Sequence, residues 1–139
     1  MKIGLSRSPN PAIPDWVNIT NYRTMTNEKK EQAVNGNKLF QHEWMKEEVN
    51  EFYEAVSLEN VEEIRDEAIG LIRTFQQFQG SKRVIGLWKK VRRDVLDVFP
   101  TRKIFVTAFV KWHKRKLQKN QAIGVTPEEL IHISKLKWK

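Results

Sequence analysis

The sequence contains no cysteine, which excludes disulfide bonds and metal sites built from thiolates. No apolar run approaches the roughly 20 residues of a membrane span, and the N-terminus lacks the apolar stretch of a signal peptide. No alternating strand pattern competes with the helical one described below. With 40% apolar and 10% aromatic residues, the chain still has the composition of a folded globule. We therefore expect a soluble, cytoplasmic, all-α protein.

Acidic residues are scarce outside one window of the chain. Residues 41–70 hold 10 of the 17 acidic side chains and only two basic ones, whereas the rest of the chain carries 23 basic and 7 acidic side chains. A protein of net charge +8 therefore keeps a concentrated group of negative charges. Because like charges repel, the usual reason for such a group is a bound cation with oxygen ligands.

Basic residues gather in the second half of the chain. Residues 82–120 hold 13 Lys and Arg side chains against two acidic ones, Asp94 and Asp97. Such a surface attracts polyanions, either nucleic acid or the phosphates of a nucleotide. A solvated helix face is the equally acceptable alternative.

Apolar residues recur at helical spacing from residue 38 onward. The period predicts one helix over residues 38–57, followed by three further long helices and one short C-terminal helix. The expected N-caps of these later helices are Asn60, Ser81, Thr101 and Thr126. We predict an all-α fold with a four-helix-bundle-like core and a short C-terminal helix.

Three prolines make residues 1–25 an expected irregular arm. Residues 26–139 are expected to form a single domain, which begins with a short helix over residues 26–34. The helix that starts at Thr101 carries Val106 and Val110 away from its main apolar stripe. Two apolar faces on one helix indicate burial on both sides, for example by a second subunit.

The acidic window places carboxylates on two consecutive helices. Glu47 and Glu51 are four residues apart and Glu48 and Glu51 three apart, which are spacings that share a helix face. On the next helix, Glu67 shares a face with position 70. If the short connection at residues 57–59 makes the helices antiparallel, these faces can meet. A hard cation such as Mg²⁺ suits such a set of oxygen ligands.

Glutamate is also common on exposed helix faces, so a solvated surface is the alternative interpretation. Glu63 shares the face of Glu67 but lies in the first turn, where a capping role and the helix dipole explain it. Glu67 lies two turns into the helix beside the apolar stripe. No effect of the helix terminus explains its position.

Two segments resemble motifs of the MazG-like, all-α nucleoside triphosphate pyrophosphohydrolases. Residues 40–56, FQHEWMKEEVNEFYEAV, resemble the first motif, whose core EExxE falls on Glu47, Glu48 and Glu51. Residues 66–73, DEAIGLIR, resemble the second motif, DELxDxLxR, which contains ExxD. Residues 111–117, KWHKRKL, resemble more loosely a basic segment on a later helix of these proteins.

The resemblance implies an enzyme that hydrolyses an NTP or dNTP to a monophosphate and pyrophosphate, with Mg²⁺ or Mn²⁺ as cofactor. The metal would hold the triphosphate and activate a water for attack on the α-phosphorus. Family members generally assemble as dimers or tetramers. The implied catalytic and metal-binding residues are Glu47, Glu48, Glu51 and Glu67, and the candidate substrate-binding residues are Lys111, Arg115, Lys116 and Trp44.

The chain departs from the family pattern at Gly70, where the family has the Asp of ExxD. Asp66 is an alternative metal ligand because residues 63–66, EIRD, also spell ExxD, although this frame points Asp66 about a third of a turn away from the face of Glu67 and Gly70. Two functions therefore remain open. One is the pyrophosphohydrolase, and the other is a catalytically inactive protein of this scaffold that binds a nucleotide, a nucleic acid or a protein partner.

Overall fold

The computed structural model describes residues 38–121 and 124–138. These residues form five helices and no strand, which confirms the predicted all-α fold with a short C-terminal helix. The predicted N-terminal arm and the helix predicted over residues 26–34 lie outside the described residues. The helices are α3 (Lys38–Ser57), α4 (Val61–Gln77), α5 (Lys82–Val98), α6 (Arg102–Gln118) and α7 (Pro127–Ser134).

The four predicted N-caps explain where the later helices begin. Asn60 and Thr101 accept hydrogen bonds from the backbone N–H groups three residues on, at 3.1 and 3.2 Å. Ser81 and Thr126 cap α5 and α7 in the same way, and Pro127 occupies the first turn of α7. Each cap provides an acceptor for an N–H group that has no partner within its helix.

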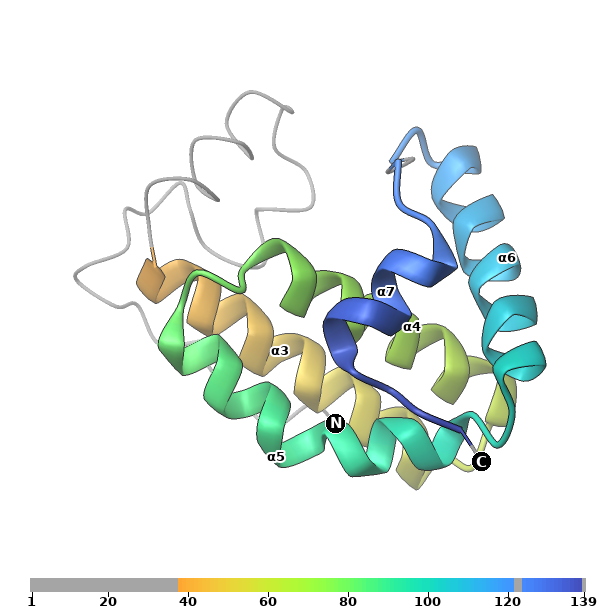
Figure 1. Ribbon diagram of the computed structural model, residues 1–139, viewed down its shortest axis with the longest axis horizontal. Helices are drawn as coiled ribbons and strands as arrows, with labels where there is room; N and C mark the ends of the chain where they lie inside the picture. The colour runs from red at the N-terminus through yellow and green to blue at the C-terminus, as the bar shows by residue number, and fades with distance from the viewer. Residues whose placement is uncertain (1–37, 122–123, 139) are drawn as a thin grey trace.

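Helices α3 and α4 form an antiparallel hairpin, and α5 runs alongside it (Figure 1). Residues 58–60 connect α3 to α4, and Glu59 adopts a left-handed conformation there with φ of 56°. This turn reverses the chain within three residues. Helix α6 lies across the end of α4, and α7 packs against α4 and α6 (Figure 1).

One hydrophobic core joins the five helices. Phe52, Ile72 and Phe105 are fully buried in it, and they come from α3, α4 and α6. Burying a side chain of this size stabilises a fold by about 1.5–3 kcal/mol. Val61, the first residue of α4, lies at the tip of the hairpin and stays 55% exposed.

The predicted second apolar face of α6 is visible on the surface. Val110 is 45% exposed, and Val106, one turn earlier, is partly exposed. Leu117 continues this line and is 53% exposed. Within the described residues, no helix has the length and apolar character needed to cross a membrane.

Candidate metal centre

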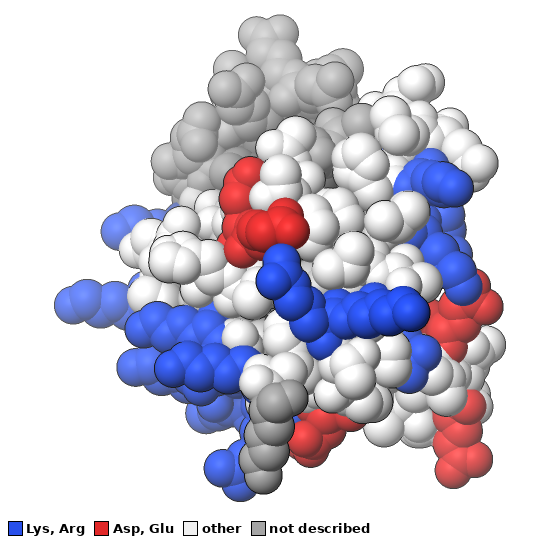
Figure 2. All heavy atoms as spheres, turned by 45° about the vertical axis from the view of Figure 1, so that its right-hand side comes forward, with Lys and Arg blue, Asp and Glu red and all other residues white. Residues whose placement is uncertain are grey.

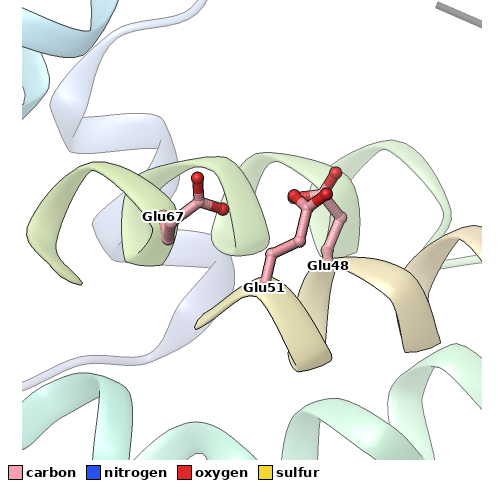
Figure 3. Close-up of side chains that lie close together, drawn as sticks. All are labelled: Glu48, Glu51 and Glu67. Carbon is pink, nitrogen blue, oxygen red and sulfur yellow. The ribbon is translucent and has the colours of Figure 1, made fainter. Parts of the chain in front are cut away.

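Three carboxylates from two helices converge at the α3–α4 hairpin. Each of Glu48, Glu51 and Glu67 places one carboxylate oxygen within 4.8 Å of the others. Glu48 and Glu51 rise together from α3, and Glu67 reaches toward them from α4 (Figure 3). The predicted meeting of two acidic helix faces is therefore present in the fold. We call these three residues the carboxylate cluster.

Local sequence and helix packing produce this geometry together. Glu48 and Glu51 are three residues apart, so their side chains project from the same face of α3. Glu67 lies in the second turn of α4, and its neighbours Ala68 and Ile69 are buried in the core. Because these apolar residues fix the rotation of α4, Glu67 is held on the side that faces α3.

The carboxylates of the cluster act on one another electrostatically. Burial and the negative charges of Glu48, Glu51 and Asp66 raise the pKa of Glu67 to about 8, and a hydrogen bond with Glu51 acts in the same direction. A carboxyl with this pKa holds a proton at neutral pH. A bound cation would replace that proton, because it would compensate the negative charges of the same carboxylates.

Trp44 contacts the cluster through Glu48. Its indole Nε1 donates a hydrogen bond of 3.2 Å to Glu48 Oε1, one helical turn along α3. The ring also makes edge contacts with Phe40 and Phe78. These contacts fix the ring in the packed body of the protein, and Trp44 thereby orients the Glu48 carboxylate.

Glu47 takes a different position from its neighbour Glu48. It is only 1% exposed, and it is outside the group of carboxylates that converge within the described residues. Glu47 and Glu48 point about 100° apart on α3, and Glu51 points between them, so helical spacing alone does not separate the two glutamates. Within the EExxE motif, the structure directs the second and third glutamates into the cluster.

Two of the candidate phosphate-binding cations form ion pairs across the α4–α6 packing. Arg115 pairs with Asp66, and Lys111 Nζ lies 3.5 Å from Glu62 Oε1. All four residues line a pocket of about 400 Å³ between α4 and α6. Asp66 is thus directed toward α6, and it influences the cluster through its charge on Glu67.

The third candidate cation, Lys116, lies over the ring of Trp112, with Nζ 5.8 Å from the ring centroid. Trp112 itself is 4% exposed and belongs to the core stripe of α6. Its indole Nε1 lies 3.8 Å from the point that a Cβ atom on Gly70 would occupy. Helix α6 therefore brings the indole N–H of Trp112 close to the position where the second motif lacks its carboxylate.

Gly70 lies beside the cluster and contributes no side chain to it. A Cβ atom at this position would lie 3.8 Å from Glu48 Oε2 and 3.8 Å from Trp112 Nε1, which are ordinary contact distances. The backbone here is held by Thr74, whose hydroxyl donates to the Gly70 carbonyl at 2.9 Å. The missing side chain would have pointed between Glu48 and Trp112.

The sequence did not predict that Trp112 lies beside the cluster. The carboxylates follow from helical spacing within one hairpin, whereas the position of Trp112 depends on how α6 crosses α4. No local pattern in residues 102–118 encodes that crossing. Searches of protein-family models, curated proteins and solved structures find no match for this chain.

The donor set of the cluster fits a hard divalent cation. It consists of carboxylate oxygens from two helices, and no nitrogen or sulfur ligand is present in the converging group. Mg²⁺ is bound in proteins through a few carboxylates, with waters and substrate phosphates completing its octahedral shell. Three carboxylates are therefore sufficient to hold such an ion and leave positions open for a ligand.

Proposed function

We propose that this chain is a Mg²⁺-dependent nucleotide pyrophosphohydrolase that converts an NTP or dNTP and water to the monophosphate and pyrophosphate. The observation that carries the proposal is the convergence of Glu48, Glu51 and Glu67 from two helices. The resemblance of residues 40–56 and 66–73 to the two motifs of MazG-like pyrophosphohydrolases supports it, because the cluster is built from those motifs.

In this proposal, Glu48, Glu51 and Glu67 hold the cation, with Mn²⁺ as an alternative to Mg²⁺. When bound, the cation supplies charge neutralisation and polarises a water for attack on the α-phosphorus. Trp44 keeps the Glu48 carboxylate in place through its 3.2 Å hydrogen bond. This fixed geometry reduces the reorganisation needed when the substrate binds.

Positive charge for the phosphates comes from α6. Lys116 lies over Trp112, and Arg115 pairs with Asp66, which neighbours Glu67 in the sequence. We propose that these two cations neutralise phosphate oxygens that extend from the metal centre. Lys111 lies one turn earlier on α6 and would extend the same basic line along the pocket. Glu47 and Asp66 do not belong to the converging group, and they remain candidate ligands that would bind the cation from farther away, through a water molecule.

The assay is incubation of the wild-type protein with Mg²⁺ or Mn²⁺ and a panel of NTPs and dNTPs, with separate detection of monophosphate and pyrophosphate. Glu51→Gln should reduce the rate at least about a hundredfold, because it removes a ligand charge from the site. Glu128→Gln is the matched control, since Glu128 is exposed on α7 and pairs with Arg102 at the surface. Absence of pyrophosphate from every nucleotide, or equal rates for the Glu51 variant and the control, would contradict the proposal.

A second function is favoured by the basic surface of α5. Its six Lys and Arg residues are all exposed, and Figure 2 shows basic side chains gathered at the left of that view. An inactive scaffold that binds nucleic acid would use this face. Binding of DNA or RNA that weakens steeply with salt, in a protein that releases no pyrophosphate, would favour this alternative over the enzyme. The six basic residues of α5 that form this face are Lys82, Arg83, Lys89, Lys90, Arg92 and Arg93.

A further inference from the structure

We propose that the pocket between α4 and α6 binds an organic phosphomonoester, whose dianionic head lies between Arg65 and Lys103 and whose organic body contacts an apolar wall. The site needs no metal and is separate from the carboxylate cluster, so the inference goes beyond the proposed function. Three observations carry it: the pocket, the two cations in it that have no acidic partner, and the apolar side chains beside them.

The pocket has the size of a small-molecule site. Its volume of about 400 Å³ lies within the range of roughly 300–1,000 Å³ that is usual for such sites. None of the three glutamates of the carboxylate cluster lines it. Lys103 and Arg115 are the first and last residues of α6 in its wall, and their separation along the helix is about 18 Å. Arg115 marks the end nearer the cluster, because its partner Asp66 neighbours Glu67.

Two cations of the pocket have no acidic partner. Both acidic residues in the wall are already paired, one with Lys111 and the other with Arg115. Within residues 38–121 and 124–138, neither Arg65 nor Lys103 forms an ion pair. The wall therefore carries two positive charges in excess, which favours an anion and disfavours a metal ion.

Arg65 and Lys103 lie at the same end of the pocket. Arg65 Nε donates a hydrogen bond of 3.3 Å to the carbonyl of Val98, the last residue of α5. The chain turns at this point, and Lys103 follows in the first turn of α6. This turn contains no acidic residue, so the positive end of the α6 dipole adds to the two charges. The bond to Val98 fixes the Arg65 guanidinium and leaves its two terminal nitrogen atoms to bind an anion.

The wall of the pocket selects the class of ligand. Val61, Ile104 and Ala108 form its apolar part, which favours a ligand with an organic body. A phosphomonoester carries close to two negative charges at neutral pH, because its second pKa is about 6. Two unpaired cations match this dianion, whereas a carboxylate would neutralise one of them. Lysine and arginine both form strong charge-assisted hydrogen bonds with phosphate oxygens.

The test is isothermal titration of phenyl phosphate and of AMP into the full chain, with EDTA present so that the cluster holds no metal. At least one ester should bind with a dissociation constant about tenfold or more below that of inorganic phosphate, because the ester also buries apolar surface. The tighter ester identifies the body as a nucleoside or as another organic group. No binding of either ester, or inorganic phosphate that binds as tightly as both, would overturn the proposal.

Variants locate the ligand in the pocket. Lys103→Gln should raise the dissociation constant about tenfold, as expected for loss of one hydrogen bond to a charged group. Lys114→Gln is the matched control, because Lys114 is exposed on the same helix and does not line the pocket. Thr107→Phe should weaken binding by a similar factor, since its ring would fill the pocket. Thr107 is exposed and its hydroxyl donates to the Lys103 carbonyl in its own helix, so we expect an unchanged melting temperature.

The site is refuted if Lys103→Gln and Thr107→Phe bind the ester as tightly as Lys114→Gln does. This result would leave the proposed function untouched, because the titration contains no Mg²⁺ and measures no turnover. The proposed function fails separately, when the wild type with Mg²⁺ or Mn²⁺ releases no pyrophosphate from any nucleotide.

Discussion

At the scale of single residues, Glu67 connects the stability of the fold to pH and to cations. Its pKa is about 8 in the folded chain, against an ordinary value of 4.5. Folding therefore favours the protonated form of this carboxyl. The stability that this preference provides is fully present below about pH 4.5, and it is lost as pH rises through 8.

We expect the melting temperature of the cation-free protein to fall between pH 5 and 9 more steeply in the wild type than in Glu67→Gln, which stays neutral. Mg²⁺ should restore the wild type more at pH 8.5 than at pH 5.5, because it competes with the proton for the same carboxylate. Circular dichroism melts across this pH range would measure both effects. Parallel profiles for the two proteins, with and without Mg²⁺, would show that Glu67 is not the group responsible.

At the scale of helices, the α3–α4 hairpin depends on the cap at its turn. Asn60 Oδ1 accepts the Glu63 backbone N–H at 3.1 Å. Asn60→Ala should lower the free energy of unfolding by about 1 kcal/mol. Asn60→Asp should stay close to the wild type, since it retains the acceptor. Urea titration would measure both, and an aspartate variant as unstable as the alanine variant would argue against a capping role.

The hairpin also shows how far the sequence alone could go. Caps and helical spacing predicted the start of α4 and the shared face of Glu48 and Glu51, because both are local properties. The sequence predicted both Glu47 and Glu48 as ligands, whereas the group that converges contains Glu48, because this depends on the rotation of α3 against α4. The pairing of Arg115 with Asp66 was equally hidden, because it is set by how α6 crosses α4.

At the scale of the whole molecule, α6 exposes a line of apolar side chains. Val106, Val110 and Leu117 lie on one face of this helix, and the last two are 45% and 53% exposed. A second copy of the chain that packs on this face would cover them. The family resemblance predicts a homodimer or homotetramer, and this face is where we expect the copies to meet.

We expect Val110→Lys to lower the molar mass of the protein in solution toward that of a monomer. The reason is that burying the unpaired charge of a lysine in an apolar contact has a high cost in free energy. Val56→Lys is the control, since Val56 is similarly exposed at 39% but lies at the end of α3. Light scattering coupled to size exclusion would measure the mass. A monomeric wild type at high concentration, or equal effects of the two variants, would place no interface on α6.

The short connection between α3 and α4 has a consequence for how the chain folds. Glu48, Glu51 and Glu67 all belong to one hairpin, so bringing them together requires closure of only a small loop. The carboxylates then meet in the same step in which α3 and α4 pair. Their mutual repulsion opposes this local step, whereas α6 and Trp112 add contacts from more distant parts of the chain. The same residues that would hold a cation in the finished fold thus oppose the pairing of α3 with α4, and a cation present during folding would reduce this opposition.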